Sequence, residues 1–152
     1  MDSFLSFRPA PVSGRAATHV DAAPARVFAL VSDVLMWPAW DGAVTHTAAR
    51  GGLGPDAEFE WLAGERRFAA RVRIHEPVHR ICWSARTLGQ RQLTSWEITP
   101  QGAGADVVLE ESRAGLLPML MPGHARRAVE VAVAARLAAL NKAAERRRSR
   151  AA

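Results

Sequence analysis

A run of short alternating segments through the middle of the chain constrains the fold most strongly. From Ala43 to Arg113, apolar and polar residues alternate with a period of two, as they do in half-buried β-strands. The sequences that separate these segments (GGLGPD, AGE, EPVH, LGQ and PQGAG) suit tight turns and loops. Short connections between successive strands predict an antiparallel meander. Its six strands are expected at 43–49, 56–63, 66–76, 79–87, 91–100 and 105–113.

The segments on either side of this meander predict one more strand and three helices. We expect a strand at 15–21, a short helix at 22–33 with Pro24 in its first turn, and a second short helix or turn at 36–41. From Pro122 to Arg148 there is no glycine or proline after Gly123, and alanine is abundant, which predicts a long helix. The fold class is therefore α+β, with residues 1–14 as a flexible arm, 15–148 as one domain and 149–152 as a basic, flexible tail end.

The long helix carries an arginine on its apolar face. At 100° per residue, Arg136 lies among Val129, Ala132 and Leu140, in the middle of a broad face rich in alanine. A buried guanidinium needs an acidic partner or a ligand, and small side chains leave space beside it. The pattern suggests a helix that closes over a cavity.

Large aromatic side chains share one face of the predicted sheet, opposite this helix. Either they interlock with the alanines of the helix, or they line an incompletely filled pocket of the kind that binds apolar ligands. The residues concerned are Phe59, Trp61, Phe68, Trp83 and Trp96.

Composition and charge exclude several classes of protein. Charged residues make up 23% and hydrophobic residues 49% of the 152 residues, and no apolar run approaches the roughly 18 residues of a membrane span. We expect a cytoplasmic protein, because the N-terminus lacks a signal-peptide pattern and Cys82 is the single cysteine. The net charge of +5 comes largely from arginines between residues 146 and 150, so we expect a solvated helix end and no nucleic-acid partner.

Four segments, in this order, resemble the SRPBCC superfamily. They are VDAAPARVFALVSDVLMWPAW (20–40), PVHRICW (77–83), WEITP (96–100) and VVLEE (107–111). This superfamily includes START-like lipid-transfer domains, birch-pollen-allergen-like proteins and polyketide cyclase/dehydrase-like proteins. The resemblance implies a helix-grip fold: a seven-stranded antiparallel sheet curled around a long C-terminal helix, with two short helices between strands 1 and 2 and a hydrophobic cavity inside. Aromatase/cyclases of this superfamily carry a Trp-Thr-Ser-Arg-Arg stretch, which the nearest segment here, CWSAR (82–86), lacks.

The candidate catalytic residues are Arg136 and Glu111. Glu111 follows two inward positions of its strand, so its carboxylate can meet Arg136 in the cavity, as a structural pair or as a group that binds an enolate or moves a proton. The candidate ligand-binding residues are Trp37, Trp40, Phe59, Trp61, Phe68, Trp83, Thr94, Trp96, Met119 and Met121, of which the methionines would form a lid. We expect no metal and no cofactor, since His75 and His79 straddle Pro77 without a third ligand.

Two functions fit these residues. In one, the cavity binds a small hydrophobic molecule and catalyses cofactor-free cyclisation or dehydration of a polyketide-like substrate. In the other, the same cavity carries or sequesters a lipid or another hydrophobic ligand without changing it. The sequence leaves the ligand, the choice between enzyme and carrier, and the oligomeric state open.

Overall fold

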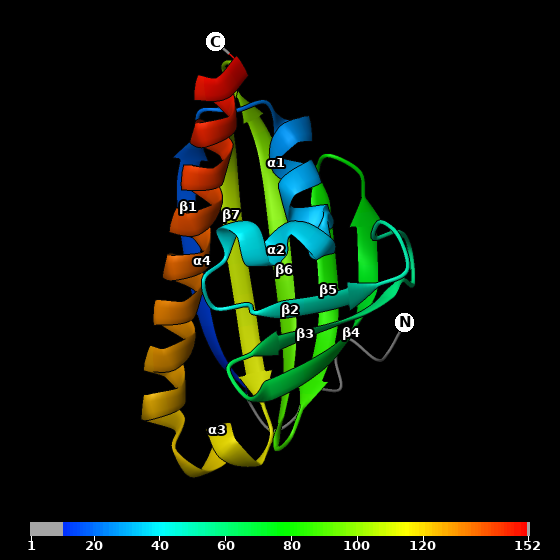
Figure 1. Ribbon diagram of the computed structural model, residues 1–152. Coiled ribbons are helices and arrows are strands. Elements are labelled where there is room, and N and C mark those ends of the chain that lie inside the picture. Colours follow the sequence, from blue (N-terminus) through cyan, green and yellow to red (C-terminus); the bar gives the residue numbers. More distant parts are fainter. Residues whose placement is uncertain (1–10, 152) are drawn as a thin grey trace.

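The computed structural model describes residues 11–151, in which one antiparallel sheet curls beside a long helix (Figure 1). The spatial order of the strands is β1-β7-β6-β5-β4-β3-β2, so that only β1 lies out of the order of the meander. The first and last strands of the chain are therefore neighbours, as the helix-grip fold requires. The strands are β1 (Val12–Val20), β2 (His46–Ala49), β3 (Glu58–Ala63), β4 (Arg66–Glu76), β5 (Arg80–Thr87), β6 (Gln90–Gln101) and β7 (Gly104–Ala114).

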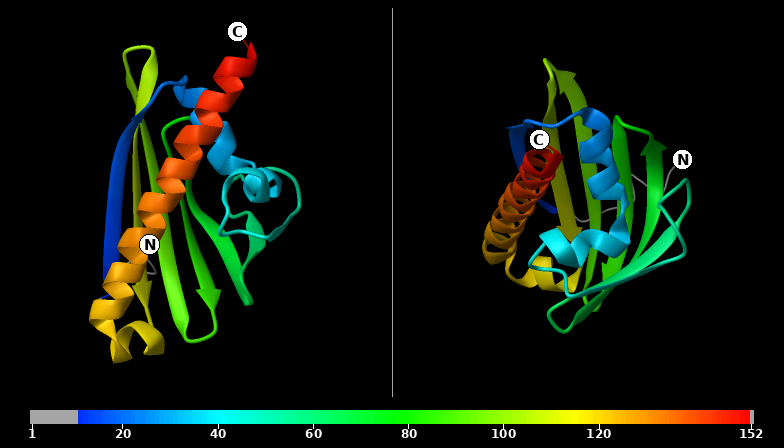
Figure 2. Two further views of the ribbon diagram at one scale, coloured as in Figure 1. Left: turned by 60° about the vertical axis from the view of Figure 1, so that its left-hand side comes forward. Right: turned by 45° about the horizontal axis from the view of Figure 1, so that its top comes forward.

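The helices gather on the inner face of this sheet. Helix α1 (Pro24–Ser32), the 3-10 helix η2 (Val34–Met36) and helix α2 (Trp37–Trp40) connect β1 to β2, and α4 (Pro122–Ala151) runs along the length of the sheet (Figure 2). The expected seven strands, the short helices between the first two and the long C-terminal helix are all confirmed. An additional short helix, α3 (Leu116–Leu120), was not predicted from the sequence.

The first strand begins earlier than expected, at Val12. Residues 1–14 contain three proline or glycine residues and little periodicity, which predicts an arm, but Gly14 pairs with Glu111 of β7 inside β1. A Cβ atom there would lie 3.0 Å from the backbone nitrogen of Glu130. The glycine therefore lets β1 and α4 approach each other closely. Residues 1–10 of the expected arm lie outside the described residues, and α4 continues to Ala151, into the expected tail.

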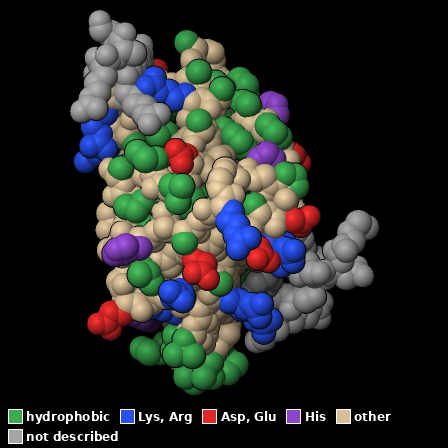
Figure 3. Space-filling view, turned by 45° about the vertical axis from the view of Figure 1, so that its right-hand side comes forward, with side chains coloured by type: hydrophobic (Ala, Val, Ile, Leu, Met, Phe, Trp, Pro, Cys, Tyr) green, Lys and Arg blue, Asp and Glu red, His purple; other side chains and the backbone are tan. Residues whose placement is uncertain are grey.

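The short helix α3 and the turn between β5 and β6 form one end of the molecule. Figure 3 shows hydrophobic side chains gathered at this end. Leu116, Leu117, Met119, Leu120 and Met121 are all about half exposed or more. Pro118 is the buried residue of this helix.

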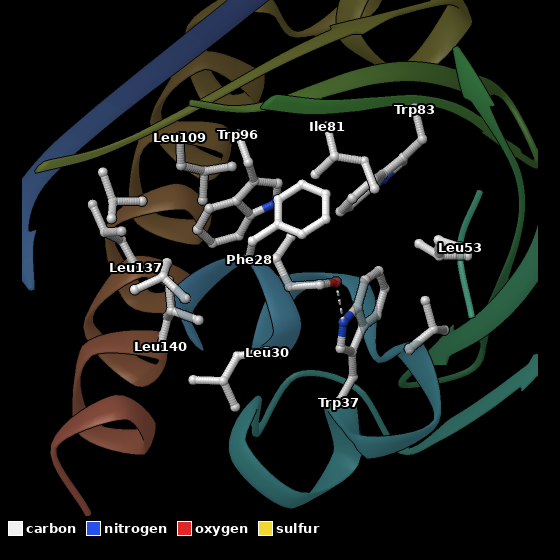
Figure 4. Packing of buried hydrophobic residues seen from close by; sticks show 14 of the residues in the cluster. Phe28, Leu30, Trp37, Leu53, Ile81, Trp83, Trp96, Leu109, Leu137 and Leu140 are labelled. Atoms are coloured by element: carbon white, nitrogen blue, oxygen red, sulfur yellow. Dashed lines mark hydrogen bonds between the residues drawn. The ribbon is translucent and has the colours of Figure 1, made fainter. Parts of the chain in front are cut away.

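The core lies between the sheet and the helices. Leu137 and Leu140 of α4 face Leu109 and Trp96 of the sheet, and α1 contributes Phe28 and Leu30 (Figure 4). The buried face of α4 is narrower than the broad alanine-rich face predicted from the sequence: Ala128 and Ala135, for example, are exposed. The larger side chains of α4 therefore make most of its contact with the sheet.

Candidate functional site

A small cavity lies between the sheet and the helices, with indole rings on most of its walls. It leaves about 10 Å³ for the centre of a water-sized sphere, which is room for about one water molecule. Its lining combines apolar and charged side chains from α1, α2, β5, β6, α4 and the residue after α2: Val31, Trp37, Trp40, Asp41, Trp83, Trp96 and Arg136.

The other predicted aromatic residues pack against one another instead of lining this cavity. Trp61 stacks on Phe68 with ring centroids 4.9 Å apart and lies 5.7 Å from Phe59. Trp37 connects this cluster to the cavity, because its ring meets Phe59 and Trp61 edge-on and its indole N–H donates to the carbonyl of Val31 at 3.0 Å. The aromatic face is thus interlocked around Phe59 and open only beside Trp83 and Trp96.

Arg136 bridges two acidic side chains from different parts of the chain. Its Nε donates to Asp41 Oδ2 at 3.0 Å, and its Nη1 lies 3.5 Å from Glu111 Oε1. Asp41 directly follows α2, where its other oxygen accepts the backbone N–H of Ala43 at 3.0 Å. One carboxylate therefore shapes the turn after α2 and holds that turn against α4.

Glu111 is the most heavily bonded carboxylate of the site. It is 2% exposed, and Thr94, its partner across β6 and β7, donates to its Oε1 at 3.1 Å. Arg113, two residues along β7, donates to Oε2 from Nε at 2.8 Å and from Nη2 at 2.7 Å. Asp41, Glu111, Arg113 and Arg136 thus form a network of two carboxylates and two guanidinium groups whose charges balance.

Three indole N–H groups at the cavity have no hydrogen-bond partner among the described atoms. They belong to Trp40, Trp83 and Trp96, all of which line the cavity. Trp83 and Trp96 are each 1% exposed. A buried donor without an acceptor is unfavourable by about 1–3 kcal/mol, so these groups favour any occupant that brings an acceptor oxygen.

The structure separates the sequence-predicted site residues into three groups. The first group lines the cavity: Trp37, Trp40, Trp83, Trp96 and Arg136. Glu111 contacts Arg136, and Thr94 donates a hydrogen bond to Glu111. Phe59, Trp61 and Phe68 form the packed cluster. Met119 and Met121 are exposed at the far end of the molecule and do not line the cavity.

Two residues of the network escaped the sequence analysis. Asp41 is the last residue of the MWPAWD segment, where a single acidic residue is typical of an exposed turn. Arg113 is the inward position that follows Glu111 by two residues, so strict alternation along β7 could have identified it.

The outer face of the sheet is polar over β2 to β5. A broad open groove of about 900 Å³ runs over β2 to β5 and is lined by charges of both signs, including Arg71, Arg73, Glu58 and Glu60. Within the described residues, no group of three or more His, Cys, Asp or Glu side chains could hold a metal ion. No helix in the described part of the chain is long and apolar enough to cross a bilayer.

A sheet that grips a long helix around a small aromatic cavity defines a helix-grip protein. The chain belongs to the family described as polyketide cyclase / dehydrase and lipid transport, which it matches over residues 11–145. No curated protein matches the sequence with significance. The family and the cavity support a role in binding hydrophobic ligands.

Several solved structures share the fold at low sequence identity. The Zhui aromatase/cyclase from Streptomyces sp. R1128 superposes with a TM-score of 0.74 at 18% identity, covering 91% of this chain and 96% of that one. A protein from Thermus thermophilus gives 0.73 at 20% identity, covering 86% and 94%. A START superfamily protein from Mycobacterium smegmatis gives 0.71 at 15% identity, covering 88% and 97%. At these identities the likeness concerns the fold.

Proposed function

We propose that this protein binds a small, polyketide-like molecule in the cavity between the sheet and α4, with an oxygen of the ligand at the indole N–H groups and Arg136. The observation that carries the proposal is the set of three buried indole donors without acceptors around one cavity. The indole faces provide apolar contact, and the N–H groups and the guanidinium provide donors for a carbonyl, phenol or enolate oxygen.

Binding requires the cavity to enlarge. The present volume holds about one water molecule, so a ligand with rings must separate the walls. The walls belong to different elements: Trp40 and Asp41 lie at the end of α2, Arg136 on α4, and Trp83 and Trp96 on the sheet. A shift of α2 relative to α4 would enlarge the space without disturbing the strand pairing.

Within this proposal, the protein catalyses cofactor-free cyclisation or dehydration. Arg136 would stabilise the negative charge that develops on a carbonyl oxygen when an enolate forms. Glu111 and Asp41 would position the guanidinium, because both accept from it and neither is aimed at the cavity as an unpaired base. The proton acceptor would then be Asp41, which lines the cavity, or a water beside it.

One observation favours the second candidate, a non-catalytic carrier. Both oxygens of Asp41 and both oxygens of Glu111 already accept hydrogen bonds. A carboxylate held in this way is a poor proton acceptor, because protonation would break charge-assisted bonds. The same cavity would then bind and release a lipid or polyketide-like ligand unchanged.

Native mass spectrometry of freshly purified protein, followed by denaturing extraction, tests the binding proposal. We expect a retained apolar molecule with at least one carbonyl or hydroxyl oxygen. Incubation of that molecule with the protein separates the two candidates, since an enzyme converts it and a carrier returns it unchanged. For an enzyme, Arg136→Lys and Asp41→Asn should abolish conversion with little loss of affinity. Glu111→Gln, which changes a positioning group, should lower conversion.

Two matched probes test the role of the indole donors. 1-Naphthol offers an aromatic ring with an oxygen, and naphthalene offers the ring alone. We expect naphthol to bind at least tenfold more tightly, and Trp96→Phe to reduce this preference, whereas Trp61→Phe in the packed cluster should leave it unchanged. Equal affinities would contradict the donor argument, and failure of both probes together with an empty purified protein would contradict the cavity itself.

A further inference from the structure

A second surface lies at the opposite end of the molecule from the C-terminus of α4, at the lower end in Figure 1. We call it the apolar tip. Its side chains are between 49% and 92% exposed, and Figure 3 shows hydrophobic side chains gathered there. None of them lines the cavity. The apolar tip consists of Leu88 in the β5–β6 turn, Leu116, Leu117, Met119 and Leu120 of α3, and Met121 after it.

The fold holds this tip in place with its apolar side chains outward. The backbone N–H of Leu117 donates to the carbonyl of Gly89 at 3.2 Å, which attaches α3 to the β5–β6 turn. Pro118 is the buried residue of α3 and faces the body of the molecule. Because the attachment uses the backbone and Pro118, the long side chains of Leu116, Met119 and Leu120 are left to the solvent. An apolar cluster of this kind marks a surface that is covered in some functional state.

Arginines surround the apolar tip. Arg126 and Arg127 lie in the first two turns of α4, and Arg86 and Arg91 stand directly opposite each other on β5 and β6 beside Leu88. Like charges in directly opposed positions are unfavourable. Among the described side chains, none forms an ion pair with any of these four arginines. Arg66, the first residue of β4, donates from Nη2 to the carbonyl of Leu88 at 3.4 Å. The adjoining β3–β4 turn contributes a single acidic residue, Glu65.

We propose that the apolar tip docks on a lipid bilayer that contains anionic headgroups. Leucine and methionine side chains would enter the acyl boundary, and the surrounding arginines would contact the phosphate groups. The positive charge around the tip selects an anionic surface, and the phosphate groups of that surface would offset the repulsion between Arg86 and Arg91. Apolar side chains lie at the end of the molecule and basic side chains lie beside them, which is the arrangement that binds the boundary between headgroups and acyl chains.

Sedimentation of the full chain with vesicles tests this proposal. The probes are phosphatidylcholine vesicles and vesicles in which about a third of the lipid is phosphatidylglycerol. We expect binding to the anionic vesicles only, weakened by added salt because exposed charges are screened. The double variant Leu120→Ser/Met121→Ser should lower the apparent affinity at least tenfold, and Arg126→Gln/Arg127→Gln should reduce the salt dependence.

Matched control variants distinguish binding through the apolar tip from nonspecific hydrophobic adsorption. Val131→Ser and Leu35→Ser remove exposed apolar side chains, 63% and 53% exposed, from other parts of the surface and should leave vesicle binding unchanged. Circular dichroism of each variant checks that it is folded.

Three results would overturn the proposal. The first is a wild-type protein that does not bind anionic vesicles. The second is binding that survives the tip variants but is lost when the arginines of residues 146–150 are replaced, because the other end of the molecule would then be responsible. The third is self-association that the tip variants abolish in the absence of vesicle binding, which would identify a second copy of the chain as the occupant.

Discussion

Replacing Arg136 by methionine tests whether the charge network holds α2 and α4 together. The change keeps a long flexible side chain and removes the guanidinium. Asp41, whose side chain is 6% exposed, would lose its charged partner and keep only the N–H of Ala43. Glu111 would keep Arg113 and Thr94. The damage should therefore be concentrated at Asp41.

The expected loss follows from the burial of the two groups. Breaking a buried ion pair by removing one partner lowers the free energy of unfolding by about 3–5 kcal/mol. The Arg136 side chain is 17% exposed, and both carboxylates keep some donors, so we expect the lower end, about 3 kcal/mol. Urea unfolding followed by tryptophan fluorescence measures this value.

The double variant Asp41→Asn/Arg136→Met provides the decisive control. Asparagine keeps an oxygen for the N–H of Ala43 and carries no charge, so the double variant should be more stable than Arg136→Met by about 1–2 kcal/mol. A loss below about 1 kcal/mol for Arg136→Met, or no recovery in the double variant, would refute the assignment of Asp41 as the main partner.

Three further predictions concern other parts of the fold. Gly14→Ala should lower the free energy of unfolding by about 1–3 kcal/mol in urea titrations, because its Cβ would lie 3.0 Å from the backbone nitrogen of Glu130 and α4 would have to move. Val78→Gly should raise it by up to about 1 kcal/mol in the same assay, because Val78 has a φ of 72° in the turn closed by Glu76 and His79. Burial raises the pKa of Cys82 from 9.0 to about 11. As the pH rises, the thiol of the unfolded chain therefore ionises before the thiol of the folded chain, which lowers the free energy of unfolding. Between pH 9 and pH 11 this free energy should fall more in the wild type than in Cys82→Ala. The chain has no tyrosine that would titrate in the same range.

The local sequence pattern was sufficient for most of the fold, because most strands pair with their neighbours along the chain. The period of two placed the strands of the meander, and short turns fixed their antiparallel order. The meander could not show where the first strand joins the sheet; the family resemblance added it as one of seven strands, and the structure places β1 beside β7. The start of β1 was predicted too late, because the proline and glycine residues among residues 1–14 indicated an arm. Gly14 instead lies inside the strand, where it allows a close approach to a helix.

The candidate site was only partly predictable, because its key contact joins distant segments. Arg136 was marked by its position on an apolar face, and Glu111 by the alternation of β7. Asp41 is 95 residues from Arg136, and nothing in a turn sequence says which helix it will face. The extent of the cavity was also not predictable. Five aromatic side chains on one sheet face predicted a pocket, but they pack against one another so that only Trp83 and Trp96 of the five border the cavity.

The ion pair between Asp41 and Arg136, which the sequence did not predict, affects how the cavity can open. Asp41 and Arg136 are two of its walls, and in the described part of the chain they form the ion pair that connects α2 to α4 across it. Enlarging the cavity by moving α2 away from α4 therefore stretches this pair. A ligand oxygen that accepts a hydrogen bond from Arg136 replaces the hydrogen bond to Asp41, whereas a hydrocarbon of equal size cannot. Ligand polarity should therefore determine how easily the cavity opens, and the difference in affinity between 1-naphthol and naphthalene should shrink when Arg136 is replaced by methionine.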